Sequence, residues 1–212
     1  YALEIGVDVI DADIQLTKDN VLVVTHDLML NKDITKDSNG NWITASIPIK
    51  NLTLKQVQSY DVGGIKPGSA TSKMYPNHQD VPKVCMPTLL EVISYLKSVA
   101  GNSVRLQIEI KTDPLKPEIS STSLAMATAL NKLLIETDMV DQVEVQAFEW
   151  QALVDLHQLN PNIKTAFLTS HSVEPMNAKE EASIVYDAQW TAPLIPAEFN
   201  YNYAKMVAKL HG

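Results

Sequence analysis

The chain has 212 residues, of which 45% are hydrophobic and 20% charged, enough to bury one large core or two small ones. With 17 Lys plus Arg against 25 Asp plus Glu, the net charge is −8 and no basic cluster interrupts it, which argues against nucleic acid as a partner. No apolar run approaches the roughly 18 residues that a membrane-spanning helix needs, and the single cysteine, Cys85, excludes an internal disulfide.

The chain begins at Tyr1 and shows no charged-then-apolar leader. We therefore expect it to be a piece of a longer protein. Its localisation stays open on this evidence, because no targeting segment can be read from it.

The first stretch with a clear pattern, residues 7–24, predicts two short apolar strands around turn residues at 18–20. Because successive strand side chains point to opposite faces, Asp11 and Asp13 are expected on the same face. Two neighbouring carboxylates repel unless something positive lies between them. An isolated Asp-x-Asp is more typical of the solvent-exposed face of a strand. The pair therefore indicates a functional site only in combination with other residues of the chain.

Residues 28–86 have weaker patterns. Residues 28–49 predict a hairpin-like excursion around a turn at 38–41. A Thr-x-x-Gln capping box at 53–56 predicts a short helix that ends near Gly63 and Gly64. Residues 62–86 are rich in Gly, Pro, Ser and Asn and predict a loop-rich insertion, of a length that is usually functional or disordered.

From residue 88 onward, helix and strand patterns alternate. The Thr88-x-x-Glu91 capping box begins a helix that stops at 101–102. Helices are also expected at 120–136, 149–159 and 196–210, and strands at 104–111, 143–148, 163–168 and, around Trp190, at 187–194. Strand followed by helix, repeated at least four times, predicts an α/β fold with a parallel sheet in a single domain, 1–212. A (β/α) barrel and an open doubly wound sheet both fit, although no Gly-rich phosphate loop supports the second.

Polar residues recur where the predicted strands end. The strand at 104–111 places Leu106, Ile108 and Ile110 on one face and Gln107, Glu109 and Lys111 on the other. The carboxylates Asp11, Asp13 and Glu109 would make a hard oxygen site suited to Ca²⁺ or Mg²⁺, since no second His or thiol lies at metal-ligand spacing. His26 is a candidate proton carrier, and Lys111 could hold a phosphate oxygen.

Seven segments of this chain resemble, in order, the signature of the glycerophosphodiester phosphodiesterases. They are Gly-Val-Asp-Val-Ile-Asp-Ala-Asp at 6–13, Leu-Thr-Lys-Asp at 16–19, Leu-Val-Val-Thr-His-Asp at 22–27, Leu-Thr at 52–53, Pro-Thr-Leu-Leu-Glu-Val at 87–92, Gln-Ile-Glu-Ile-Lys at 107–111 and Val-Gln-Ala-Phe at 145–148. Each segment alone is modest evidence, but their common order is specific. Weaker similarity continues through Trp190.

The resemblance implies a TIM-type (β/α)₈ barrel. It also implies metal-dependent hydrolysis of a small-molecule glycerophosphodiester to glycerol 3-phosphate and an alcohol. By position, Asp11, Asp13 and Glu109 would bind a divalent metal ion, Ca²⁺ or Mg²⁺, and His26 would be one of two catalytic histidines. A periplasmic or secreted location is compatible with the resemblance.

Two departures from the family pattern bear on activity. The family usually has Glu where this chain has Asp11, a side chain that is one methylene shorter. The family also begins with a strand ending in His-Arg-Gly, followed by Pro-Glu-Asn-Thr, which supplies its other catalytic histidine and has no counterpart from Tyr1 onward. We therefore expect residues 1–212 to lack the first and last barrel strands, and to be inactive and prone to aggregate when expressed alone.

Two alternatives stay open: a non-catalytic barrel of the same family, suggested by Asp11, and a phospholipase D-like enzyme acting on lysolipids. Cys85 is expected to pack as a small hydrophobe. Trp190 is expected in the substrate cleft or in the core. The other histidines are expected to have surface or capping roles; they are His78, His157, His171 and His211.

Overall fold

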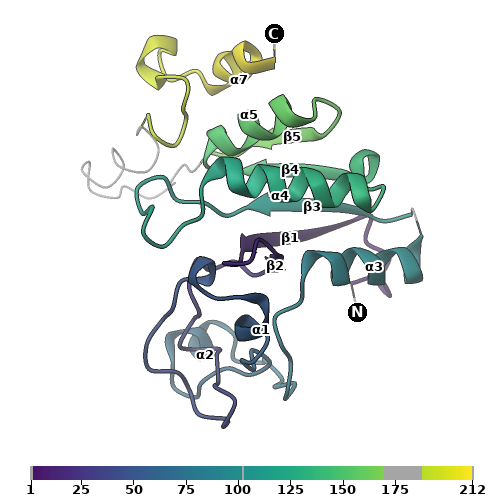
Figure 1. Ribbon diagram of the computed structural model, residues 1–212, viewed down its shortest axis with the longest axis vertical. Coiled ribbons are helices and arrows are strands. Elements are labelled where there is room, and N and C mark those ends of the chain that lie inside the picture. Colours follow the sequence, from purple (N-terminus) through teal and green to yellow (C-terminus); the bar gives the residue numbers. More distant parts are fainter. Residues whose placement is uncertain (1, 102, 170–187, 212) are drawn as a thin grey trace.

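The computed structural model describes residues 2–101, 103–169 and 188–211 (Figure 1). Within them, one sheet has the strand order β2-β1-β3-β4-β5. The strands are β1 (Val9–Leu16), β2 (Leu22–Val24), β3 (Arg105–Ile110), β4 (Val143–Ala147) and β5 (Lys164–Phe167). Neighbours β1, β3, β4 and β5 are parallel, and β2 pairs antiparallel with the end of β1. The predicted first hairpin and the parallel sheet are confirmed.

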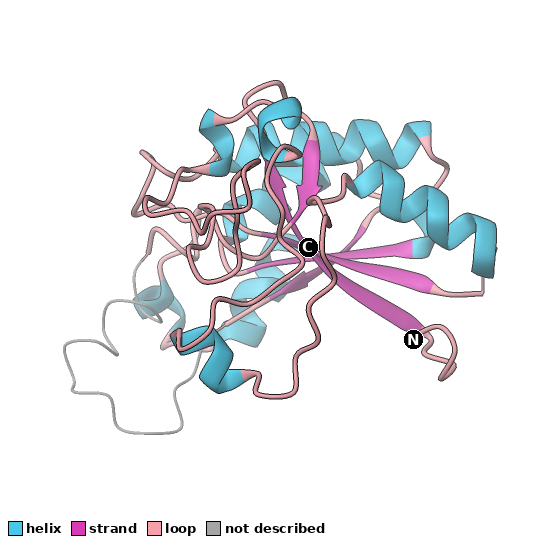
Figure 2. Ribbon diagram, turned by 90° about the horizontal axis from the view of Figure 1, so that it is seen from below, coloured by secondary structure: helices cyan, strands magenta, loops and turns pink. Residues whose placement is uncertain are grey.

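Three helices connect the parallel strands and lie along one face of the sheet (Figures 1 and 2). They are α3 (Leu89–Ala100), α4 (Ser123–Glu136) and α5 (Trp150–Leu159), and a short 3₁₀ turn, η2 (Val140–Gln142), precedes β4. Such an alternation of strand and helix around a parallel sheet is the repeating unit of a (β/α) barrel. The predicted α/β fold class is therefore confirmed.

The core lies between the sheet and these helices. On β1 the buried hydrophobic residues are Ala12, Ile14 and Leu16, every second position, and the buried hydrophobic residues of β3 and β4 follow the same alternation. The helices contribute Leu89, Ile93, Leu96, Met126, Leu130, Leu134, Leu153 and Leu156 to the same cluster. Since burying one such side chain contributes about 1.5–3 kcal/mol, this face fixes the orientation of every strand and turns the intervening polar side chains to the other face.

Both predicted capping boxes are present. The Thr88 side chain accepts a hydrogen bond from the Glu91 amide while Glu91 accepts one from the Thr88 amide, which begins α3. Thr53 and Gln56 do the same for α1 (Leu54–Val57). The predicted end of that helix near Gly63 is wrong, because α1 stops at Val57 and the chain then makes a series of turns.

The segment between β2 and α3, residues 25–88, is called the excursion from here on. It packs around a small core of its own, made of Val23 of β2 together with Leu30, Ile49, Leu52, Val57 and Met86. It contains η1 (Ile49–Asn51), α1 and α2 (Ala70–Met74), and it lies at one end of the structure in Figure 1. Single bridges join Met29 to Pro48 and Lys36 to Trp42, in keeping with the expected hairpin-like path. The loop-rich stretch 62–86 thus carries one short helix that the sequence did not predict.

Three other expectations are corrected. Residues 188–194 form turns and no strand, because they pair with no neighbouring strand. The predicted last helix is interrupted: η3 (Pro196–Phe199) ends at Asn200, which is left-handed at φ 51°, before α7 (Tyr203–His211) begins. Cys85 is exposed and does not pack in the core. In the part of the chain that the structure describes, no helix has the length and apolar character needed to cross a membrane.

Candidate active site

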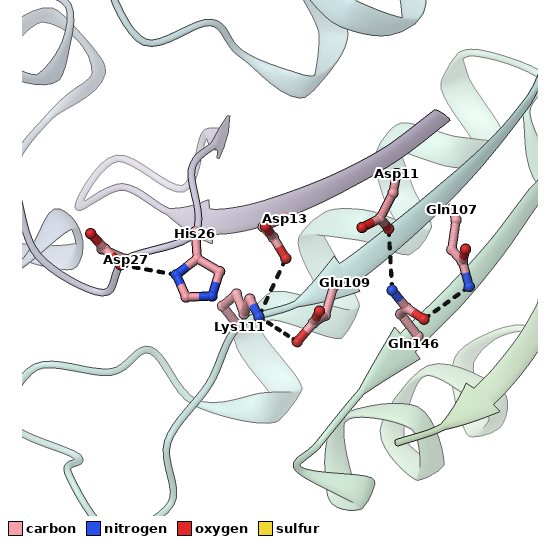
Figure 3. Close-up of polar contacts among 8 residues, drawn as sticks. All are labelled: Asp11, Asp13, His26, Asp27, Gln107, Glu109, Lys111 and Gln146. Atoms are coloured by element: carbon pink, nitrogen blue, oxygen red, sulfur yellow. Dashed lines mark hydrogen bonds and ion pairs between the residues drawn. The ribbon is translucent and has the colours of Figure 1, made fainter. Parts of the chain in front are cut away.

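The face of the sheet opposite the helices carries a row of polar side chains. Asp11 stands beside Gln107 and Asp13 beside Glu109 in the β1–β3 register. Across the next ladder, Glu109 stands beside Gln146 of β4. The prediction that Asp11 and Asp13 share a face is therefore confirmed. The register places Glu109 on this face as well, and Figure 3 shows these side chains on neighbouring strands.

Lys111 joins two of the predicted carboxylates. Its Nζ lies 2.6 Å from Glu109 Oε1 and 3.4 Å from Asp13 Oδ1. Lys111 follows directly after β3 on the same face as Glu109, so the alternation of the strand brings the ammonium back over the carboxylate. The same ammonium lies 5.9 Å from the centre of the Phe148 ring, within reach of a cation–π interaction.

Glu109 is the most buried member of this group, with only 7% of its surface exposed. Burial raises the pKa of its carboxyl above the ordinary value. The hydrogen bond and charge of Lys111 act in the opposite direction, and the neighbouring Asp13 adds to the rise. Burial has the largest effect on this pKa. The ionised form of Glu109 is therefore unfavourable unless a positive charge lies beside it.

Asp11 is held by a different partner. Its Oδ1 accepts a hydrogen bond of 3.1 Å from Gln146 Nε2, and Gln146 Oε1 in turn accepts one of 2.8 Å from Gln107 Nε2. In Figure 3 the Asp11 side chain points toward Gln146, whereas Asp13 and Glu109 point toward Lys111. The structure thus brings Lys111 into direct contact with both Asp13 and Glu109. Asp11 lies two residues before Asp13 on β1 and contacts Gln146 instead.

His26 follows β2 and lies at the start of the excursion. Its Nδ1 is 2.9 Å from Asp27 Oδ1, and Asp27 Oδ2 accepts a 2.8 Å hydrogen bond from Asn31 Nδ2. When Nδ1 carries the proton and donates it to Asp27, Nε2 is the ring atom free to accept or release a proton. The imidazole is largely exposed and lines the same cavity as Glu109 and Lys111.

That cavity has a volume of about 930 Å³. Its polar residues His26, Glu109 and Lys111 come from the carboxyl ends of the strands and the segments that follow, where (β/α) barrels place their active sites. Apolar walls are supplied by residues from distant parts of the chain: Leu28, Met29, Leu115, Ile119, Phe148, Trp150, Leu168, Trp190 and Tyr203. The indole N–H of Trp190 is buried and has no hydrogen-bond partner among the described residues.

The donor set has the chemistry of a hard-cation site. Asp13 and Glu109 offer carboxylate oxygens on adjacent strands, and the buried Glu109 requires a compensating charge, which Lys111 provides in this structure. Across residues 2–101, 103–169 and 188–211, however, the side chains form no group of three or more His, Cys, Asp or Glu that could hold a metal ion as they stand. Two of the three predicted ligands are side by side, and the third, Asp11, is turned to Gln146.

For the other histidines, the sequence predicts surface or capping roles. His78 is in the excursion, 3.6 Å from Asp80, and His157 is on α5; neither lines the cavity. His211 ends α7, and His171 lies outside the described residues.

The sequence did not identify Asp27 as the partner of His26 or Gln146 as the partner of Asp11. The alternation Glu144-x-Gln146, which repeats Gln107-x-Glu109 on the next strand, was the signal that could have identified Gln146.

Fold and site together define a (β/α)-barrel protein with carboxylates, a lysine and a histidine at the carboxyl ends of its strands. The chain belongs to the glycerophosphoryl diester phosphodiesterase family, whose model matches residues 1–211. It is 29% identical over 184 residues to a glycerophosphodiester phosphodiesterase of Bacillus subtilis (strain 168), covering 86% of this chain and 54% of the relative. It is also 29% identical over 168 residues to one of Caldanaerobacter subterraneus subsp. tengcongensis, covering 79% and 57%. The chain thus spans a little over half the length of these curated relatives.

Solved structures show the same fold. A Silicibacter pomeroyi protein assigned to the glycerophosphoryl diester phosphodiesterases superposes with a TM-score of 0.73 at 23% identity, over 84% of this chain and 59% of that one. An Oleispira antarctica phosphodiesterase, solved in complex with the product sn-glycerol-3-phosphate, gives a TM-score of 0.55 at 20% identity, over 84% and 60%.

Proposed function

We propose that the protein hydrolyses glycerophosphodiesters to glycerol 3-phosphate and an alcohol with the help of a divalent cation, and that residues 1–212 belong to one catalytic barrel domain, with a loop-rich insertion at 62–86. The observation that carries this proposal is the Asp13–Lys111–Glu109 cluster, of which Glu109 and Lys111 line the same cavity as His26 at the carboxyl ends of the strands. Family membership and the product bound to the Oleispira antarctica relative support the substrate class.

Lys111 is suited to hold the phosphodiester. Its side chain is 17% exposed and lines the cavity, so the ammonium can reach a bound anion while it stays paired with Glu109. An ammonium acts on phosphate as a point charge and offers three donors. Charge that develops on the phosphoryl oxygens in the transition state would be stabilised in this position.

His26 is suited to move the proton that hydrolysis requires. The Asp27 carboxylate, itself held by Asn31, orients the ring through Nδ1. Nε2 would take a proton from the attacking water as the oxygen of that water bonds to phosphorus, or deliver a proton to the oxygen of the departing alcohol as the bond from phosphorus to that oxygen breaks.

Asp11, Asp13 and Glu109 are the proposed ligands of the cation, Ca²⁺ or Mg²⁺ being the hard ions that such oxygens select. When bound, the ion would supply positive charge that polarises a phosphoryl oxygen. Support comes from the adjacent positions of Asp13 and Glu109 and from the buried charge of Glu109.

A second candidate is hydrolysis of lysolipids at the same bond. The aliphatic and aromatic residues around the cavity favour it, since Leu115, Ile119 and Phe148 could accommodate an acyl chain beside the polar cluster. A glycerophosphodiester without an acyl chain would leave this apolar surface in contact with water.

One assay separates these activities. The full-length protein is incubated with glycerophosphocholine and, separately, with lysophosphatidylcholine, each with Mg²⁺ or Ca²⁺ and with a chelator. Release of glycerol 3-phosphate from the first substrate, abolished by the chelator, is the expected result. Lysophosphatidate formed from the second alone would favour the lysolipid activity. No turnover of either, with the cation still bound, would make the protein a non-catalytic member of the family and would refute the proposal.

A further inference from the structure

A chain of side-chain amides crosses the polar face of the sheet beside the proposed cation site. Gln107 Nε2 lies 2.8 Å from Gln146 Oε1 and 3.4 Å from Glu144 Oε1, and Gln146 Nε2 lies 3.1 Å from Asp11 Oδ1. This series of hydrogen bonds therefore runs from β4 through β3 and back to β4, and then reaches β1. Figure 3 shows the part that joins Gln107, Gln146 and Asp11. The series is separate from the Asp13–Lys111–Glu109 cluster.

We propose that Gln146 is a positioning residue: it orients the carboxylate of Asp11 and thereby sets the affinity of the site for its divalent cation. The inference rests on the proposed function, because it takes Asp11 as a ligand. It assigns a role to a residue that does not line the cavity.

The first argument is geometric. Gln146 is only 9% exposed and stands beside Glu109 in the β3–β4 register, so its side chain has little room to move. Because Gln107 donates to its carbonyl oxygen, the amide group of Gln146 must present its N–H to Asp11. The Asp11 carboxylate is thus fixed through Oδ1, and Oδ2 takes no part in this hydrogen bond.

The second argument concerns freedom of rotation. Asp11 is exposed on its strand, and an exposed Asp populates several rotamers. A carboxylate that must meet a cation in one orientation loses affinity for every rotamer in which it points elsewhere. Outer partners that hold a ligand in place typically contribute about 10- to 100-fold to metal affinity.

The third argument concerns charge. Gln146 lies near two carboxylates, Asp11 by hydrogen bond and Glu109 by register. A glutamate of the same size would add a third negative charge and could not donate a hydrogen bond when ionised. An amide supplies the donor without the charge, which is what a site already rich in carboxylates requires.

The experiment measures the Kd of the full-length protein for Mg²⁺ and for Ca²⁺ by isothermal titration calorimetry, with no substrate present. Gln146→Met keeps the length of the side chain and removes its polar atoms; we expect Kd to rise by about 10-fold or more. Gln151→Met is the matched control, because Gln151 Nε2 donates a 2.7 Å hydrogen bond to Asp155 Oδ1 on α5, away from the site. Its Kd should equal that of the wild type.

A double-mutant cycle tests whether Gln146 acts through Asp11. In an Asp11→Asn background, Gln146→Met should change Kd less than 2-fold, since the carboxylate it orients is gone. A loss of the same size in both backgrounds would mean a general structural role and would overturn the inference. Unchanged Kd in a folded Gln146→Met protein would do so as well.

Two further variants keep the outcomes distinct. If Gln146→Met does not fold, Gln107→Met tests the same chain, since it frees the Gln146 amide to turn; unchanged Kd in this variant would then refute the inference. Asp13→Asn tests the cation site itself. Loss of binding in Asp13→Asn with normal binding in Gln146→Met would leave the proposed function standing and remove this inference alone. A wild-type protein that binds neither cation would refute both.

Discussion

The ammonium of Lys111 lies 2.6 Å from the carboxylate of Glu109, two residues earlier in the chain, and 3.4 Å from the carboxylate of Asp13 on the neighbouring strand. Two carboxylates in adjacent register positions would otherwise repel each other. Lys111 therefore has two roles that can be tested. In the protein without a bound ligand it neutralises the charge of Asp13 and Glu109, and it also lines the cavity in which an anion would bind.

The neutralising role predicts that Lys111→Met destabilises the protein. Without the ammonium, the buried Glu109 and Asp13 lack compensation, and a loss of about 1–3 kcal/mol is expected for a charged hydrogen bond of this kind. Urea denaturation in the presence of a chelator measures it. Lys132→Met is the control, because Lys132 forms an exposed pair with Glu136 at 3.9 Å that should contribute less than about 0.5 kcal/mol. Equal stability of the two variants would contradict the prediction.

Asp13→Asn should abolish activity of the full-length protein and leave the fold intact. The substitution keeps the shape of the side chain but removes the charge that a divalent cation or the Lys111 ammonium requires. Turnover of glycerophosphocholine and circular dichroism are the measurements. Asp8→Asn, at an exposed position just before β1, serves as the control and should be active. An active Asp13→Asn protein with unchanged chelator sensitivity would rule out Asp13 as a ligand.

His26→Ala should lower kcat by roughly 10²-fold or more and change KM little, since a proton carrier acts mainly in the transition state. The matched control is His78→Ala: His78 also pairs with a neighbouring aspartate, at 3.6 Å, but it does not line the cavity. Steady-state kinetics of both variants give the comparison. If the effect of His26→Ala were confined to KM, His26 would be a binding residue.

Glu149 provides a test that depends on pH. Burial raises the pKa of its carboxyl above the ordinary 4.5, and the charges of Asp155 and Asp113 add to the rise. The folded protein therefore binds this proton more tightly than the unfolded chain, and ionisation of Glu149 costs stability as pH rises from about 4.5 through the raised pKa.

Glu149→Gln should accordingly raise Tm at pH 7, and the gain should shrink as pH falls toward 4.5. Thermal unfolding followed at several pH values measures it, with the exposed Glu118→Gln as the control. A variant that is less stable than the wild type at pH 7 would show that the ionised Glu149 makes a net favourable interaction.

Gly63→Ala should destabilise the excursion, because a Cβ at this position would lie 1.7 Å from the backbone oxygen of Val81. The two segments are joined there by hydrogen bonds from Val81 N to Gly63 O, 2.7 Å, and from Val62 N to Val84 O, 2.8 Å. A cost of about 1–3 kcal/mol is expected from overpacking against backbone.

Amide hydrogen exchange of residues 61–84 would detect the loosened contact in that variant. Gly68→Ala is the comparison: its Cβ meets open space, so only the strain of φ +77°, about 1–2 kcal/mol, should appear, without faster exchange at 81–84. Identical exchange in both variants would show that the close approach of Val81 does not hold the loop.

The local sequence determined the strands, their faces and the beginnings of the helices. The alternation of Leu106, Ile108 and Ile110 with Gln107, Glu109 and Lys111 requires only a two-residue period, and the structure buries the first set and turns the second to the site. The capping boxes at 53–56 and 88–91 depend on contacts three residues apart, so they too could be predicted and are confirmed. The order of the motifs indicated the family.

Contacts between distant segments were decided only by the tertiary structure. Gln146 is 135 positions from Asp11, and their hydrogen bond exists because the register of three strands aligns them. No local pattern specifies that register. The turns around Trp190 could not be predicted for the same reason: an apolar stretch becomes a strand only if a neighbouring strand accepts its hydrogen bonds, and the Trp190 carbonyl instead accepts one from the amide of Trp150 on α5.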